Sequence, residues 1–437
     1  MAQENLKGAS SLKEAAKAAY LPGIDFTGTY FYNQRIINLL GEDAKLPTMS
    51  FDPSTGTYQY NIVKGPDGKP VVNPETGGYI PSEIAVIPKE AMSYDIHNVF
   101  AGAFTLTQPV YMGGQIRALN QIAGFGEKIA AAMSENVAQE IIYSVDEAYW
   151  TVVSLKEKKE LAESFVALTD SLCKNVSLML EQGVATKSDL LSVEVRANEA
   201  NIALVKVSNG LTLSRMALAQ ICGLQPSTMM VLSDEELKYT DLKKAQKPDM
   251  EDVYSHRADL EIVRQSINLF KSRENLALSE LLPKIAVVGA YSFSNPNLID
   301  GFKKRFGGGF SVGAMLQVPI WHWGGDYKRY KAAKSNTAAQ RLLLEDLEEK
   351  VQLQVSQAQF SLDEAEKTYK MATLNLTKAD ENLRQAQLGF REGMLTTSDV
   401  LAAQTAWLGA NSEKIDAEIG VRLAHTYLSK VLGSLTY

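Results

Sequence analysis

The sequence contains few of the residues from which metal centres and disulfide frameworks are built. Among 437 residues there are two cysteines and four histidines. Cys173 and Cys222 lie in no CxxC pattern and have no histidine pair near them. We therefore predict no metal site, no disulfide framework and no bound cofactor.

Long apolar runs and a basic charge excess are missing as well. No run of 18 apolar residues occurs, so the sequence predicts no transmembrane helix. The net charge of −7 argues against a nucleic-acid partner. Residues 1–20 lack the apolar core of a secretory signal, which taken alone would predict a cytoplasmic protein.

One sequence pattern resembles a catalytic motif. Residues 309–313 read GFSVG, which fits the GxSxG pattern of a serine nucleophile. That motif needs a sharp turn from a strand into a helix, whereas here it lies inside an alternating strand pattern. We therefore predict no catalytic residue and no enzymatic activity.

Two short stretches with the same spacing organise the chain. GVATKSDLL begins at Gly183 and GMLTTSDVL begins at Gly393, 210 positions later. Glycine suits the left-handed position that ends a helix, and Thr-x-x-Asp can form a capping box that starts the next one. The capping residues are Thr186 with Asp189, and Thr396 with Asp399. Each stretch predicts a tight helical hairpin, and the fixed offset indicates a duplicated chain.

The remaining patterns recur around these turns and predict two repeats. The first, residues 1–256, has a short helix at 4–19, a strand, and a long, partly structured loop at 34–93, in which 58–63 and 71–72 could form a small hairpin around the turn at 65–68. A second strand, a helical hairpin turning at 183–189 and an irregular segment at 223–250 follow. The second, residues 257–437, has a helix, a strand pair and a helical hairpin turning at 393–399. The helix before the strand pair is predicted from about 251 to 280.

The four predicted strands alternate between an aromatic, apolar face and a small or polar face. Val312 and Leu316 belong to the apolar face, and Ser311 and Gln317 to the opposite one. Four strands cannot close a barrel, but three chains would supply twelve strands for a closed ring in the outer membrane. A soluble four-stranded sheet with one buried face is the alternative.

Two apolar rows run along the long helix of the second repeat. Leu344, Val351 and Ala358 begin a row with a heptad spacing, and Val355 and Leu362 begin its companion, so that the two together form one seam as in a coiled coil. A second row with Leu353 and Phe360 lies about 200° away around the helix. Two rows predict two helical neighbours, as in a wall of helices, and the alternative is an ordinary bundle core.

With these features in place, the sequence resembles the TolC family of outer-membrane efflux proteins over nearly its whole length. The resemblance rests on the duplicated strand-strand-helix-helix order and on the two Gly-x-x-Thr-x-x-Asp turns. Leu-Pro pairs precede the strands at 21–22 and 282–283, and Gly-Gly pairs follow them at 113–114 and 324–325. Residues 257–260 read RADL, similar to the family's Arg-Pro-Asp-Leu helix start.

The resemblance implies a mixed α/β membrane protein that is mainly α-helical. It implies a homotrimer whose 12-stranded antiparallel β-barrel, with four strands per chain, joins a 12-helix α-barrel. Such a protein is a passive export duct of a tripartite efflux pump or type I secretion system, in the outer membrane of a Gram-negative bacterium and extending into the periplasm. The implied partners are outer-membrane lipid, a periplasmic adaptor (membrane fusion protein) and, through it, an inner-membrane transporter.

Three groups of site residues follow. The resemblance assigns adaptor docking to the hairpin tips, at Gly183, Val184, Thr186, Asp189, Gly393, Met394, Thr396 and Asp399. It assigns a periplasmic constriction to Asp399, Leu395 and Phe390. Aromatic residues where strand becomes helix, Tyr111, Trp321 and Trp323, are predicted to form a girdle at the membrane interface, with local packing as the alternative.

The sequence departs from the family pattern in two ways. The signal peptide and the start of the first helix are expected to be missing, because the counterpart of Arg257 would precede Met1. At the tip, Ala402 stands where some members have a second acidic residue, and Leu395 replaces an arginine. The alternative function is a soluble periplasmic coiled-coil scaffold without transport activity.

Overall fold

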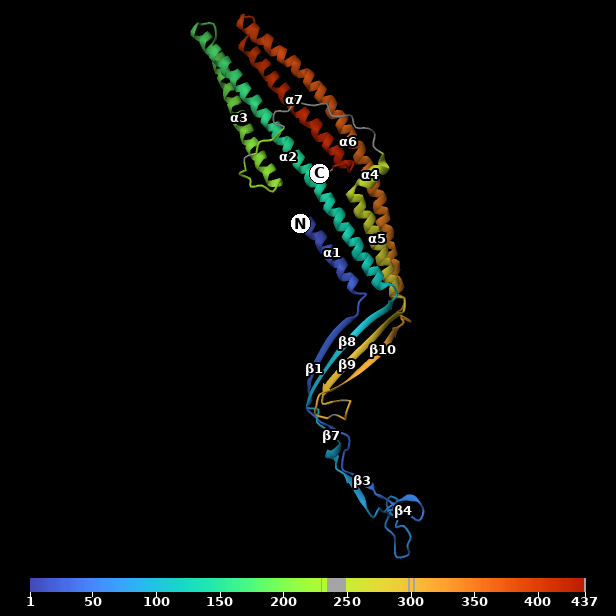
Figure 1. The fold of residues 1–437 in the computed structure, drawn as a ribbon. Helices are drawn as coiled ribbons and strands as arrows, with labels where there is room; N and C mark the ends of the chain where they lie inside the picture. Colours follow the sequence, from blue (N-terminus) through green and yellow to red (C-terminus); the bar gives the residue numbers. More distant parts are fainter. Residues whose placement is uncertain (229, 234–248, 298, 302, 436–437) are drawn as a thin grey trace. The chain divides into compact units, whose positions relative to one another are not determined.

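The chain divides into a helical unit and a strand unit (Figure 1). The computed structural model describes residues 1–228, 230–233, 249–297, 299–301 and 303–435. The helical unit comprises Met1–Ala16, Arg117–Ala277 and Gly325–Tyr437, and the strand unit comprises Lys17–Ile116 and Leu278–Gly324. Of the predicted irregular segment 223–250, residues 229 and 234–248 lie outside the described residues.

Two helical hairpins of matching length dominate the helical unit. The first pairs α2 (Gln115–Glu181) with α3 (Lys187–Ile221), and the second pairs α6 (Gly325–Arg391) with α7 (Thr397–Val431). The long helices have 67 residues each and the return helices have 35 each. Neither long helix contains proline, so the backbone ladder runs unbroken for roughly 100 Å. Within the described residues, no helix combines the length and the hydropathy needed to cross a membrane.

Three shorter helices complete the unit. They are α1 (Ala2–Ala18), α4 (Met250–His256) and α5 (Ala258–Ser279). The prediction of one continuous helix from 251 to 280 is wrong, because Arg257 is extended with ψ 117°. Its guanidinium donates to both carboxylate oxygens of Asp259, at 2.9 and 2.6 Å, and to the carbonyl of Val431 at 3.0 Å. The hydrogen bonds of Arg257 therefore link the start of α5 to the C-terminal end of α7.

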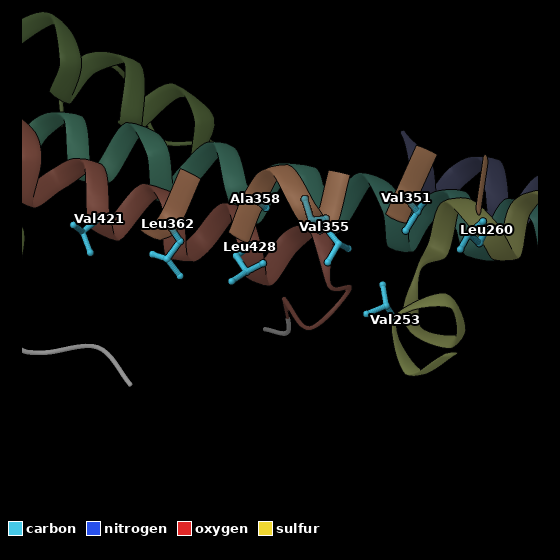
Figure 2. Packing of buried hydrophobic residues seen from close by; sticks show 9 residues of the cluster. Val253, Leu260, Val351, Val355, Ala358, Leu362, Val421 and Leu428 are labelled. Atoms are coloured by element: carbon cyan, nitrogen blue, oxygen red, sulfur yellow. The ribbon is translucent and has the colours of Figure 1, made fainter. Parts of the chain in front are cut away.

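The first predicted heptad row forms the core against α7. Val351, Val355, Ala358 and Leu362 of α6 pack with Val421, Leu428 and Val431 of α7, and Val253 and Leu260 join from α4 and α5 (Figure 2). Alanine at position 358 is fully buried, which lets the two helix backbones approach closely. The prediction that this row is a packing seam is confirmed.

Four antiparallel strands form the main sheet of the strand unit, in the order β1 (Gly23–Tyr32), β8 (Asn98–Met112), β9 (Lys284–Asn295) and β10 (Gly307–Gln317). The register aligns a row of aromatics across all four strands, Phe26, Phe104, Tyr291 and Phe310. The adjacent row holds Asp25, Thr105, Ala290 and Ser311. Because directly paired residues share a face, the predicted separation into aromatic and polar faces is confirmed.

The segment between β1 and β8 forms a β-ribbon and not a loose loop. Short strand pairs follow one another along it: β2 (Ile37–Asn38) with β7 (Ser93–Tyr94), β3 (Ala44–Pro47) with β6 (Ile84–Ile87), and β4 (Met49–Asp52) with β5 (Thr57–Tyr60). A 3₁₀ turn, η1 (Lys89–Met92), precedes β7. The predicted turn at 65–68 is present, and the N–H of Val71 donates to the carbonyl of Val63 across it at 2.9 Å. Residues 58–60 of the predicted hairpin pair instead with β4.

Candidate functional site

The two hairpin turns have nearly identical local geometry. Gly183 and Gly393 have φ of +74° and +72°, a region that side chains with a Cβ rarely occupy. In each turn the residue after glycine donates its N–H to a carbonyl five positions earlier, at 2.8 Å, which satisfies a terminal helix carbonyl. Glycine is therefore required by the backbone at both turns, whatever the turns contact.

A complete capping box starts each return helix. The N–H of Asp189 donates to Thr186 Oγ1 at 3.1 Å, and the N–H of Thr186 donates to Asp189 Oδ2 at 2.9 Å. The same bonds join Asp399 and Thr396, at 3.3 and 2.8 Å. The threonine side-chain and backbone hydrogen bonds hold the pKa of both aspartates below its usual range. The predicted capping boxes are confirmed.

Replacing Thr396 with alanine should weaken the start of α7. The loss of one cap typically costs about 0.5–2 kcal/mol, and the pKa of Asp399 should rise because its principal hydrogen-bond partner is removed. Since the folded-state pKa is lowered, the contribution of Asp399 is present above its unfolded pKa and is lost as the pH falls through the folded value. Amide hydrogen exchange in the first turn of α7, measured against pH, tests this.

Ser398→Ala is the matched control for the cap, because Ser398 is exposed and stands beside Asp399. We expect it to leave both the exchange rates and the aspartate pKa unchanged. Equal acceleration of exchange in the two variants would contradict the assignment of the cap to Thr396.

The residues predicted to act at the tips differ in exposure. Val184 and Met394 are 69% and 76% exposed at the outside of their turns. Leu395 lies over Gly389, where a Cβ would come within 2.8 Å of its side chain. Phe390 is buried in a cluster with Leu172, Val176, Val193 and Val400, which joins α2, α3, α6 and α7 near the turns. The tips thus combine exposed apolar residues with a shared core beneath them.

The aromatic face of the sheet is exposed in the single chain. Phe310, Val312 and Leu316 of β10 are each more than 60% exposed, and Ile24 and Phe26 of β1 are exposed as well. The outer edges of β1 and β10 have no strand partner among the described residues. A soluble sheet would bury such a face, so this arrangement is suited to a lipid surface and to neighbouring strands.

The predicted interfacial aromatics lie at the ends of β8 and β10. Tyr111 belongs to β8, and Trp321 and Trp323 follow β10 with their rings 6.0 Å apart in an edge-to-face arrangement. Trp323 is 88% exposed and has φ of +53°, unusual for a bulky residue. Exposed tryptophan next to an apolar strand face is typical of a membrane interface.

Two exposed apolar rows occur on the helices. The second predicted row of α6, with Leu353, Phe360, Leu374 and Leu388, is exposed. A further row on α3 was missed by the sequence analysis: Leu191, Val195, Ile202, Val205, Leu213 and Met216. Their spacing of three, four, seven or eight residues places them on one side of the helix, and this periodicity was the signal available in the sequence.

The serine motif and the metal prediction can be placed on the structure. Ser311 lies within β10 and pairs with Ala290 of β9, so the residues around it form a strand and not a strand-to-helix turn. Among the described residues, no group of three or more His, Cys, Asp or Glu side chains is arranged to hold a metal ion.

An exposed apolar strand face, open sheet edges and long helical hairpins define a channel protein of the TolC-like class. Residues 88–224 and 250–434 match the family described as outer membrane efflux protein. The chain belongs to this family, which is one of efflux channels and not of enzymes, and its location is the outer membrane of a Gram-negative bacterium.

Known proteins resemble the chain over most of its length. The outer membrane efflux protein BepC of Brucella suis biovar 1 (strain 1330) is 21% identical over 333 residues, which cover 76% of this chain and 71% of BepC. The Campylobacter jejuni CmeC outer membrane channel has a TM-score of 0.72 at 14% identity, covering 99% of this chain and 82% of CmeC. The open state of the Neisseria gonorrhoeae MtrE outer membrane channel has a TM-score of 0.73 at 14% identity, covering 100% and 87%.

Proposed function

We propose that three copies of the chain form one passive export duct, with a 12-stranded β-barrel in the outer membrane and a 12-helix tube in the periplasm. The observation that carries this proposal is the open sheet, whose apolar face is exposed and whose two edges are free among the described strands. In lipid every backbone group needs a partner, so the edges must pair with other chains. Twelve strands leave a lumen, whereas a ring of eight is about filled by its own side chains.

The exposed helical rows support the same assembly. The row on α6 and the row on α3 both consist of large apolar side chains that are between 40% and 76% exposed. Packing them against neighbouring chains would remove them from water and close the helices into a wall. In this assembly residues 1–256 and 257–437 are two repeats of the same strand-strand-helix-helix unit.

The polarity of the duct follows from the chain connections. The ribbon between β1 and β8 joins two strands at the end away from the helices, and outer-membrane barrels place their longer loops outside the cell. Tyr111, Trp321 and Trp323 then form the girdle at the periplasmic interface of the membrane. The hairpin turns lie at the far periplasmic end, where Asp399 and Leu395 constrict the tube and the buried Phe390 supports them from the core.

We assign adaptor docking to the tips because their exposed apolar residues are supported by a buried apolar cluster. The capping boxes and the buried cluster beneath the turns fix the backbone. The side chains of Val184 and Met394 are exposed and are not part of that cluster. An adaptor that seals against this rim would connect the duct to an inner-membrane transporter. Whether that transporter expels small molecules or secretes proteins, the duct itself performs no chemistry.

The oligomeric state tests the assembly directly. Extracted from outer membranes in detergent, the protein should have the protein mass of three chains by light scattering with correction for bound detergent. A monomer that remains soluble without detergent would contradict the proposal and would favour a periplasmic scaffold.

The docking assignment predicts the effect of charges at the tips. Val184→Glu combined with Met394→Glu should abolish adaptor binding and export, because desolvating two carboxylates per chain at an apolar contact is costly. The trimer should persist, since a helix of 67 residues separates each turn from the strand that precedes it in the chain. Co-purification of the adaptor measures its binding, and an export assay in cells measures transport. Lys174→Glu, an exposed change on α2, is the control. Normal export by trimers of the double variant would reject docking at the tips.

A further inference from the structure

The ribbon between β1 and β8 carries a row of exposed apolar and aromatic residues along one face. Met49 pairs with Tyr60, and Phe51 with Tyr58, while Ile84 and Val86 pair with residues two and four positions before Met49. Alternate residues of one strand share a face. These six residues, Met49, Phe51, Tyr58, Tyr60, Ile84 and Val86, are called the ribbon stripe, and each is between 46% and 67% exposed.

Along β4 and β5 the opposite face of the ribbon is polar and its groups bond to one another, whereas along β3 and β6 that face holds Leu46, paired with Ala85. Ser50 Oγ donates to Asn61 Oδ1 at 2.6 Å, and Asn61 Nδ2 donates to Thr48 Oγ1 at 2.7 Å. Gln59 Nε2 donates to Asp52 Oδ2 at 3.2 Å. The polar groups of β4 and β5 are therefore satisfied within the chain and in water, whereas the ribbon stripe gains only when its apolar surface is covered.

A ribbon of this kind needs a packing partner. An isolated two-stranded hairpin is marginally stable in water and becomes stable when a further layer covers its apolar face. The rings of Phe51 and Tyr58, whose centroids are 5.4 Å apart, contact each other within the ribbon stripe. This contact therefore leaves the outer surface of the stripe uncovered. The pairing that leads from β1 into the ribbon is continuous at its base, where the N–H of Asn33 donates to the carbonyl of His97 at 2.8 Å.

We propose that the partner is the ribbon of a neighbouring chain, so that the three ribbon stripes pack together into one collar beyond the barrel. This rests on the proposed function, because it needs the trimer. The ribbon is continuous with a boundary between chains, because it extends from β1, whose free edge forms such a boundary in the proposed barrel.

Charge argues against a lipid surface as the occupant. Residues 34–93 contain five basic and seven acidic side chains. An anionic lipid surface attracts basic segments, and an acidic ribbon would be repelled from it. A second copy presents the same neutral aromatic stripe, and aromatic pairs of this type attract one another.

Photo-crosslinking at two adjacent positions tests the collar in the full-length trimer. The variants are Tyr58→p-benzoylphenylalanine on the ribbon stripe and Gln59→p-benzoylphenylalanine on the polar face, each irradiated in intact cells. We expect an adduct of two chains, at twice the mass of one, from position 58 and none from position 59. The molecular mass of the unirradiated variants in detergent is measured in parallel.

The outcomes separate this inference from the proposed function. A trimer that gives no chain-to-chain adduct at position 58, an equal yield at both positions, or an adduct at 58 with lipopolysaccharide or another protein would overturn the collar alone. A protein that is monomeric before irradiation would overturn the trimer and, with it, the collar. The chain-to-chain adduct confined to position 58 would support both.

Discussion

Arginine at Val312 is expected to prevent assembly in the outer membrane, and arginine at Leu316 to impair it, whereas arginine at Ser311 or Gln317 is expected to be tolerated. Val312 and Leu316 share the exposed aromatic face of β10, and the other two residues lie on the opposite face. Arginine facing lipid near the bilayer midplane costs about 2–4 kcal/mol, and less near the interfaces. Val312 lies at the centre of its strand, and the proposed trimer would carry the change three times.

The measurement is the amount of trimer recovered from purified outer membranes for each variant at equal expression. Ser311 is the matched control for Val312, and Gln317 is the control for Leu316. The two residues of each pair lie on opposite faces of the strand but at almost the same depth in the membrane. If the four variants assembled equally well, the assignment of the aromatic face to lipid would be wrong.

Leu260→Ala is expected to cause the largest loss of stability among single changes in the helical unit. Leu260 is fully buried where α5 meets α6, in the cluster that also contains Val351 and Val355 (Figure 2). Truncating a buried leucine to alanine typically costs about 2–5 kcal/mol, since transfer energy is lost and a cavity remains. The urea midpoint for loss of helical circular dichroism in detergent should fall accordingly.

Leu278→Ala is the control on the same helix. Leu278 is 38% exposed, so truncating it removes less buried surface. Its urea midpoint should change much less than that of Leu260→Ala. Similar shifts in the two variants would show that the cluster around Leu260 does not carry the stability that its burial indicates.

Local patterns were enough to predict the features with local physical causes. Both capping boxes follow from residue types three positions apart, and the strand faces follow from alternation, as with Ser311 and Val312. The packing seam containing Val351 and Ala358 follows from the heptad. In each case the deciding interaction lies within one or two turns of helix or one strand pair, so the sequence alone contains it.

Features decided by distant residues were not predictable in this way. The break between α4 and α5 depends on Arg257 reaching the carbonyl of Val431, which lies 174 positions further along the chain. Residues 57–60 pair with β4 because Thr48 and Asn61 bond across the ribbon, whereas the nearer turn at 65–68 suggested another partner. The burial of Phe390 likewise depends on α2 and α3.

The equal lengths of the two hairpins restrict how such a duct can grow or shrink. One residue added to α2 alone rotates everything beyond it by 100° and moves it by 1.5 Å, which would turn its packing face away from its neighbour. A heptad nearly restores the face, at a step of about 10 Å. In the proposed trimer both turns reach the same rim, so the step has to occur in α2, α3, α6 and α7 together. The length of the proposed periplasmic tube can therefore change only in steps of a heptad. Chimaeras of different length should function only when all four helices change by the same number of heptads.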